Sequence, residues 1–128
     1  MVLDSSAIIA IHTREQGHQG LQTRIEEAKL VVVGTPTLVE TAMVLSSRLG
    51  HDARPQLRGW LRDFNIEVLP FTETHADAAI VAFRRFGKGR HAAALSMGDC
   101  MAYAVASTTG LPLLCVGGDF ARTDITLA

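Results

Sequence analysis

The chain opens with MVLDSSAIIAI (residues 1–11), which joins a short strand, a carboxylate and the start of a helix. Residues 1–3 are an apolar run, residues 4–6 are of the types that cap helices, and residues 7–11 are typical of a buried helix. A strand that turns directly into a buried helix is characteristic of α/β folds. The same stretch places Asp4 at the carboxyl end of the first strand.

The alternation of strands and helices continues along the chain. Further strands are predicted at residues 30–33, 66–69 and 113–116, helices at residues 35–49, 53–64, 74–86 and 96–109, and an amphipathic segment at residues 19–28. Glycine, which commonly ends helices, follows three of these segments, at Gly50, Gly87 and Gly110. The pattern predicts a single domain, residues 1–128, with an α/β sandwich fold whose central sheet is mainly parallel and flanked by helices.

Two helices carry more detailed expectations. Thr35 is expected to cap the helix at residues 35–49, with Pro36 at its first position. In the helix at residues 74–86, the spacing of the apolar residues predicts the buried face. That face comprises Ala76, Ala79, Ile80 and Phe83.

Composition and charge exclude several classes of protein. No run approaches the roughly 18 apolar residues of a membrane span, and the start lacks the pattern of a secretory signal, so we expect a cytoplasmic protein. Cys100 and Cys115 form no C-x-x-C pair and lie in apolar stretches, which favours buried thiols over a disulfide or a zinc site. The net charge of −1 argues against a general nucleic-acid-coating protein, because such binding needs many Lys and Arg contacts to phosphates.

Four carboxylates are predicted to converge at one edge of the sheet. Asp4 follows the first strand and Asp119 follows the last. Glu40 and Asp99 lie in the first turns of helices that begin near the same edge if the connections are right-handed. In open parallel sheets, this edge is where ligands bind.

Each acid also has a purely structural explanation. Asp4 can cap the first helix, residues 37–40 and 96–99 match capping boxes, and Asp119 can belong to a Gly-Gly-Asp turn. However, Glu40 is the only charged residue between Thr35 and Ser47, and Asp99 is the only one between Ser96 and Thr109. Isolated acids in apolar helices need partners, which favours a shared site.

A buried cluster of carboxylates requires a cation, because like charges repel strongly in a medium of low dielectric constant. Oxygen ligands without a His/Cys set favour Mg²⁺ or Mn²⁺ over zinc. Such a site can hydrolyse phosphodiesters through a metal-activated water, without a protein nucleophile. Whether one or two ions bind is left open.

Over its whole length, the chain resembles PIN-domain ribonucleases, specifically the VapC toxins of bacterial toxin–antitoxin pairs. The resemblance rests on an ordered set of motifs. These are Val2-Leu3-Asp4-Ser5-Ser6-Ala7, Thr37-Leu38-Val39-Glu40-Thr41-Ala42, Gly87-Lys88-Gly89-Arg90-His91, Gly98-Asp99-Cys100, Pro112-Leu113-Leu114 and Gly118-Asp119-Phe120.

The resemblance implies a PIN-like three-layer sandwich and a metal site with Asp4, Glu40, Asp99 and a fourth acid. Asp119 is preferred over Asp124 as that acid, and Ser6 matches a family position beside the acids. The resemblance also implies Mg²⁺-dependent RNA cleavage, a homodimer, and inhibition by a VapB-like antitoxin in a heterotetramer or larger complex.

Two hypotheses concern ligands of the acidic site. Lys88, Arg90 and His91 lie between or beside glycines and could contact RNA phosphates or an antitoxin carboxylate; a mobile solvated loop is the other interpretation. Because four acids create a strong local field, we also expect an antitoxin to place a cation there, most naturally an Arg.

Other classes of protein fit less well. Phosphatases that form a phosphoaspartate need a second acid two positions after the first, where this chain has Ser6. Receiver-like domains need an Asp that closes a middle strand, but Gly34 and Pro70 follow the strands here. The alternative that stays open is a catalytically inactive PIN-like module that binds RNA or protein.

Overall fold

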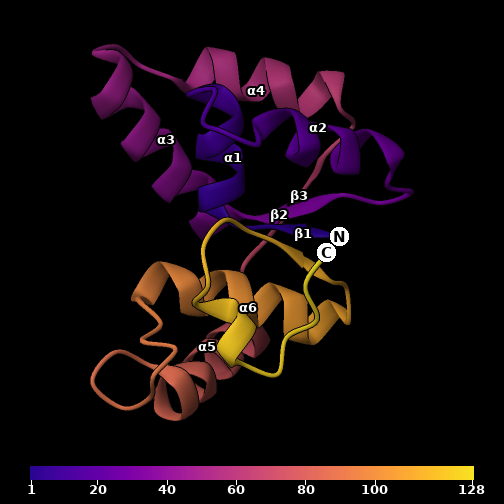
Figure 1. Cartoon of the computed structure of the whole chain (residues 1–128). Helices are drawn as coiled ribbons and strands as arrows, with labels where there is room; N and C mark the ends of the chain where they lie inside the picture. The colour runs from indigo at the N-terminus through magenta and orange to yellow at the C-terminus, as the bar shows by residue number, and fades with distance from the viewer.

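The centre of the molecule is one parallel sheet of four strands, seen in a computed structural model that describes residues 1–128 (Figure 1). The strands are β1 (Val2–Leu3), β2 (Val32–Gly34), β3 (Glu67–Leu69) and β4 (Leu113–Leu114). They lie in the order β3-β2-β1-β4, and Val2 pairs with Val32 on one side and with Leu113 on the other. All pairs are parallel, which confirms the predicted sheet.

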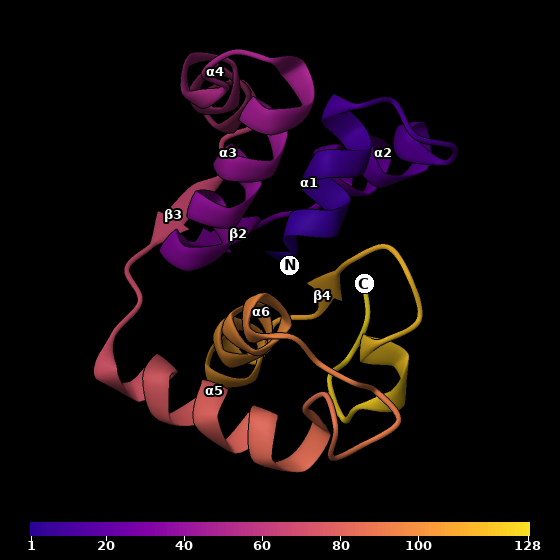
Figure 2. The ribbon, with the colours of Figure 1, turned by 90° about the vertical axis from the view of Figure 1, so that its left-hand side faces the viewer.

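Helices cover both faces of the sheet, which completes the predicted three layers. The helices α1 (Ser5–His12), α2 (His18–Glu27), α3 (Thr35–Leu49) and α4 (Arg54–Asp63) lie on one side. The helices α5 (Glu73–Phe86) and α6 (Met97–Thr109) lie on the other, as both views show (Figures 1 and 2). A short 3₁₀ helix, η1 (Phe120–Arg122), follows β4. None of the helices combines the length and apolarity that a membrane crossing requires.

The alternation of side chains along β1 divides the core between the two helical layers. Val2 packs in a cluster with Ala102, Tyr103 and other residues of α5 and α6, whereas Leu3 packs with Ile8 and Leu57 on the opposite face. Both residues are fully buried, because β1 lies between two other strands and beneath helices on both faces. The end of β1 is therefore enclosed on both sides and on both faces, and Asp4 follows it directly.

The predicted ends of α3 and α6 are confirmed, but the predicted start of α3 is wrong. Gly50 and Gly110 adopt the left-handed conformation (φ 73° and 71°) that ends α3 and α6 as expected. The N-cap of α3 is Gly34, and Thr35 lies inside the helix, so the prediction that Thr35 caps α3 is wrong. The strand β2 runs straight into the helix at Gly34, which leaves no extended residue at Thr35 to act as a cap.

The buried face of α5 also differs from the prediction. Ala79, Ala82 and Phe86 are buried, while Ile80 is 60% and Phe83 40% exposed. The small side chains of Ala79 and Ala82 allow α5 to pack closely on α6, and they share a core cluster with Cys100 and Ala102 of that helix. This packing turns the larger Ile80 and Phe83 outward.

The strand β4 is shorter than the predicted span of residues 113–116. Its partner β1 ends at Leu3, and the amide of Asp4 makes the last bond to this edge, at 3.0 Å from the carbonyl oxygen of Leu114. Beyond that point β1 has become α1, so the residues from Cys115 onward have no strand to pair with. They form the loop that leads over the carboxyl edge of the sheet.

Candidate metal centre

The helices α1, α3 and α6 all begin at the same end of the sheet, at the left in Figure 1. Asp4 lies at this end as the N-cap of α1, only 4% exposed. Its Oδ2 accepts hydrogen bonds from the backbone N of Ser6 at 3.0 Å and from the Ser6 hydroxyl at 2.5 Å. Burial raises the pKa of Asp4 to about 6, and the negative charges of Asp99 and Glu40 add to the rise, against the opposing effect of the Ser6 bonds.

Ser6 connects this carboxylate to the loop that follows β4. While its hydroxyl donates to Asp4, its oxygen accepts from the backbone N of Val116 at 2.9 Å. The Asp4 side chain is therefore fixed from two directions, by its own helix and by a segment more than a hundred residues later. Ser6 thus orients Asp4 in this structure.

Glu40 reaches the same region from the first part of α3. Its Oε1 accepts a hydrogen bond of 2.6 Å from the hydroxyl of Ser5, which is buried. Its carboxylate lies against Gly98 in the first turn of α6, in the space that a Cβ would fill at that position. Glu40 forms no capping box with Thr37, so that structural explanation for the acid does not hold.

Asp99 is held at the start of α6 by a reciprocal capping box with Ser96. Its Oδ2 accepts from the backbone N of Ser96 at 2.8 Å, and the Ser96 hydroxyl accepts from the backbone N of Asp99 at 3.2 Å. Asp99 therefore does form the capping box that its sequence motif predicted. Its charge nevertheless acts on Asp4, since it contributes to the raised pKa there.

The two candidates for a fourth acid lie in different surroundings. Asp119 is exposed at the start of η1, and together with Asp4 and Asp99 it adds to the effect of burial that raises the pKa of Cys115 to about 11. Asp124 instead accepts a 2.8 Å hydrogen bond from the Tyr103 hydroxyl and forms a 3.0 Å ion pair with Arg85. The charge of Asp119, unlike that of Asp124, acts on the same thiol as the charges of Asp4 and Asp99.

The acids are neighbours without forming a closed ligand shell. No group of three or more His, Cys, Asp or Glu side chains lies close enough together to hold a metal ion as the side chains stand. Instead, Asp4, Glu40 and Asp99 each turn to a nearby serine. This is how mutually repelling carboxylates are expected to settle when only local donors are available.

The donor set nevertheless fits a hard divalent cation. Asp4, Glu40 and Asp99 offer only oxygen atoms, and none of the three ion pairs in the molecule includes any of them. A carboxylate as buried as Asp4 is costly without a compensating positive charge. Mg²⁺ and Mn²⁺ are the ions that such oxygen-only sites favour.

The basic residues of the predicted loop are exposed, just before the start of α6. Lys88 and Arg90 lie on the surface, and the Arg90 guanidinium stacks 5.3 Å from the ring centre of Phe83. Gly89 adopts a positive φ of 81°, as the tight turn requires. His91 accepts a hydrogen bond from the backbone N of Ala93 through Nδ1. The loop leads directly into Ser96 and Asp99.

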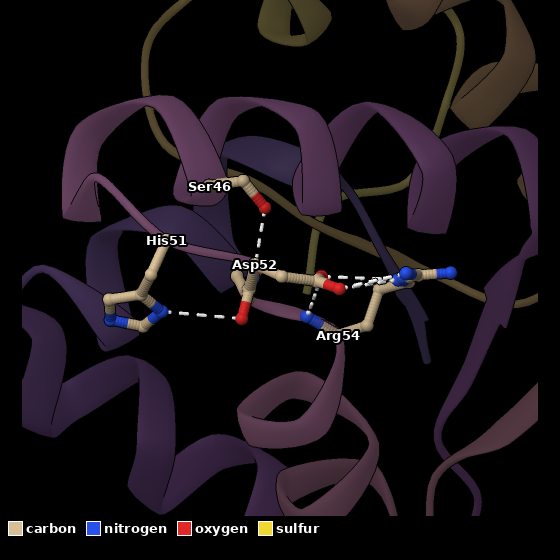
Figure 3. Close-up of polar contacts among 5 residues, drawn as sticks. Ser46, His51, Asp52 and Arg54 are labelled. Atoms are coloured by element: carbon tan, nitrogen blue, oxygen red, sulfur yellow. Dashed lines mark hydrogen bonds and ion pairs between the residues drawn. The ribbon is translucent and has the colours of Figure 1, made fainter.

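Arg54, the first residue of α4, is paired with a neighbouring acid at the corner between α3 and α4. Figure 3 shows Arg54 bound to Asp52, with a closest N–O distance of 2.8 Å, and Ser46 bound to the backbone at the corner between α3 and α4. The Arg54 contacts lower the pKa of Asp52 to about 2. His51 in the same corner contacts the carbonyl oxygen of Asp52. These contacts fix the corner between α3 and α4.

Two residues that shape the acidic site, Ser5 and Gly98, were not singled out from the sequence. Ser5 binds Glu40, and Gly98 gives its carboxylate room. The available signal was a glycine in the first turn of a helix, where a residue with higher helix propensity would ordinarily be favoured. Both cysteines are free thiols; Cys100 is buried as predicted, whereas Cys115 is only partly buried.

The comparisons with known proteins show the family to which this parallel three-layer fold belongs. Residues 1–125 match the model of the PIN domain family. The chain belongs to this family and, by its similarity to curated proteins, to the VapC ribonucleases. It is 39% identical over 98% of its length to Ribonuclease VapC of Mycolicibacterium smegmatis, covering 97% of that protein. It is 41% identical over 98% of its length to Ribonuclease VapC36 of Mycobacterium tuberculosis, covering 91% of that protein.

Solved structures share the fold at lower identity. Mycobacterium tuberculosis VapC20, described as a toxin that cleaves the sarcin-ricin loop, aligns with a TM-score of 0.79 at 18% identity, covering 99% of this chain and 97% of that one. A toxin–antitoxin complex from Klebsiella pneumoniae aligns with a TM-score of 0.73 at 16% identity, covering 99% and 95%. At these identities the matches establish the fold alone.

Proposed function

We propose that the chain is an Mg²⁺-dependent endoribonuclease toxin whose metal centre comprises Asp4, Glu40 and Asp99, with Asp119 at its rim. The observation that carries the proposal is the buried carboxylate of Asp4, whose pKa is raised to about 6 beside two further acids and without a paired cation. Burying an ionised carboxylate without a paired cation destabilises the folded state. A bound cation would offset this cost.

The acids and the serines that bind them would have different roles at the metal centre. Asp4, Glu40 and Asp99 would hold Mg²⁺, with Mn²⁺ as a substitute, through their carboxylate oxygens. A bound ion of this kind supplies a water of lowered pKa and positive charge for the phosphate oxygens. Ser6 keeps Asp4 in position, and Ser5 does the same for Glu40. Because ligands bind metal only in the deprotonated form, the ion competes with the proton that Asp4 otherwise binds tightly.

RNA is the proposed substrate because the related proteins are named ribonucleases. The exposed Lys88 and Arg90 precede the helix that carries Asp99, so they are suited to contact phosphates near the cut bond. Single-stranded or loop regions are the expected targets, because proteins usually read RNA sequence there. The free thiols Cys100 and Cys115 suit the reducing cytoplasm, where this RNA would be met.

A VapB-like antitoxin is the proposed inhibitor, since structures with this fold include a toxin–antitoxin complex. None of the three acids has a cationic partner in the chain itself, so an antitoxin Arg would supply the missing positive charge through charge-assisted hydrogen bonds. A peptide that inhibits equally well after its basic residues are replaced would contradict this mode of inhibition.

A homodimer is proposed through the apolar surface of α5 and α6. Ile80, Phe83 and Met97 are exposed and line a cavity of about 490 Å³, in which eight of the nine lining residues are apolar. Val39 and Met43, on α3 in the other helical layer, are also exposed. An exposed apolar surface is stabilised when it is buried against another apolar surface. In a twofold dimer the second copy presents the same surface. Two antitoxin chains would then complete a heterotetramer or larger complex.

The test is cleavage of mixed cellular RNA by purified wild-type protein and by Asp4→Asn, each with Mg²⁺ and with EDTA. We expect cutting by the wild type in Mg²⁺ only, and a loss of at least about a hundredfold in the variant. Asp124→Asn is the matched control, because that acid is bound to Tyr103 and Arg85 and should leave cutting intact. Activity that is absent throughout would favour an inactive PIN-like binding module, and activity that survives both treatments would indicate a contaminant.

A further inference from the structure

The carboxylate of Glu40 occupies a space that exists only because residue 98 is glycine. A Cβ built on Gly98 would overlap with Oε2 of Glu40 and lie 2.8 Å from its Cδ. Apart from its chain neighbours and the backbone of its own helix, the three nearest atoms to this position all belong to Glu40. The space beside Gly98 is therefore filled by the Glu40 carboxylate.

Backbone conformation does not require glycine at this position. Gly98 lies in the first turn of α6 and is not among the residues with a positive φ. Alanine has a higher helix propensity than glycine, so local structure alone would favour a side chain there. The absence of a Cβ is explained by the space that it leaves for the Glu40 carboxylate.

The opposite side of the same carboxylate is held by Ser5. The Ser5 hydroxyl donates a 2.6 Å hydrogen bond to Oε1, while Oε2 faces Gly98. Ser5 is buried and belongs to the first turn of α1, directly after Asp4. One contact from α1 and one from α6 thus bring a side chain of α3 to the edge of the sheet where Asp4 lies.

We infer that Gly98 and Ser5 are positioning residues that set the place of the Glu40 carboxylate beside Asp4. The inference rests on the proposed metal centre, since it assigns these two residues their effect through Glu40. Glu40 is only half-buried and ends a flexible side chain, so a methyl group at position 98 would displace it without disrupting the helix. Gly98→Ala is therefore expected to impair the site and spare the fold.

The measurement is the affinity of the full-length protein for Mn²⁺ by electron paramagnetic resonance, with the melting temperature as a second readout. Gly98→Ala should weaken Mn²⁺ binding about tenfold or more, the size typical of changes in residues that position metal ligands. Its melting temperature should not fall. Ser5→Ala should weaken binding less, because it removes one hydrogen bond and displaces nothing.

Gly20→Ala is the matched control, since Gly20 also lies within a helix and has nothing within 4 Å of the position of a Cβ. It should leave Mn²⁺ binding unchanged. The decisive comparison repeats Gly98→Ala in a Glu40→Ala background, where the carboxylate is gone. If Gly98 acts only through Glu40, the second substitution changes nothing there.

Two results would overturn the inference. One is Gly98→Ala binding Mn²⁺ like the wild type while Glu40→Ala binds weakly. The other is an equal loss with and without Glu40, or a melting temperature well below that of Gly20→Ala, either of which would make Gly98 a structural residue. Failure of the proposed function itself would look different, because Asp4→Asn and Glu40→Ala would then both bind Mn²⁺ as tightly as the wild type.

Discussion

Replacing Asp4 by Asn is expected to stabilise the metal-free protein at neutral pH while abolishing its activity. The pKa of Asp4 is raised from an ordinary value of 3.8 to about 6, chiefly by burial. Since one pKa unit corresponds to about 1.4 kcal/mol, the ionised side chain costs the folded state about 3 kcal/mol. Asn keeps an oxygen that can accept the Ser6 hydrogen bonds, but it carries no charge.

The pH dependence of this effect has a definite sign. Asp4 binds its proton more tightly in the folded than in the unfolded chain, because its pKa is raised on folding. Its contribution to stability is therefore fully present below about pH 4 and is lost as the pH rises through about 6. The advantage of Asp4→Asn should be close to zero at pH 4, grow across this window and stay constant above it.

Urea unfolding in EDTA, followed by circular dichroism at a fixed protein concentration, measures this difference. At pH 7.5 we expect Asp4→Asn to be more stable by about 2 to 3 kcal/mol, and Asp119→Asn, at an exposed acid, to change stability by less than about 0.5 kcal/mol. Added Mg²⁺ should stabilise the wild type and narrow the gap. Equal stability of wild type and Asp4→Asn at pH 7.5, or a difference that does not vary with pH, would refute the reasoning.

Three further predictions concern the fold and the assembly. Gly34→Ala should lower the free energy of unfolding by about 1 to 3 kcal/mol in urea, because its Cβ would lie 2.8 Å from Cγ2 of the buried Val105; an unchanged value would contradict this close approach. Tyr103→Phe removes the hydrogen bond to Asp124 and should cost about 1 kcal/mol in the same assay while RNA cleavage is retained, so a loss of cleavage would mean that Asp124 belongs to the site. Ile80→Glu should convert the proposed dimer to a folded monomer in light scattering, and a variant with the wild-type mass would place the interface elsewhere.

Much of the fold could be predicted from the sequence because its local signals agree with its long-range pairing. The short apolar run before Asp4 and the glycines at positions 50 and 110 mark element ends that the structure confirms. The end of β4 could not be predicted, because it depends on where its partner β1 turns into α1. The buried face of α5 was predicted only in part: Ala79 is buried as expected, but Ile80 and Phe83 are exposed, because helix periodicity treats Ile80 and Ala79 as equally suited to the core. Close packing of α5 on α6 favours the alanine.

The candidate site, too, could be predicted from the sequence only in part. Isolation in apolar helices predicted that Glu40 and Asp99 share a site with Asp4. In the structure the charges of both acids add to the raised pKa of Asp4, while their assignment to one metal site stays a prediction. The spacing of acids could not reveal that Asp99 would also cap its helix while Glu40 would not, because both matched the same motif. Nor could it reveal the role of Ser5 and Gly98, which depends on three helices meeting at one edge of the sheet.

The central claim is that Asp4, Glu40 and Asp99 together bind a divalent cation. Anomalous diffraction from crystals of the protein grown with Mn²⁺ tests this claim most directly, because it locates the ion independently of activity. We predict one strong peak at the carboxyl edge of the sheet, within ligand distance of Asp4 and Asp99 and adjacent to Glu40, and its absence in Asp4→Asn crystals. A map without a peak at this edge at saturating Mn²⁺, or a peak that persists unchanged in Asp4→Asn, would contradict the account.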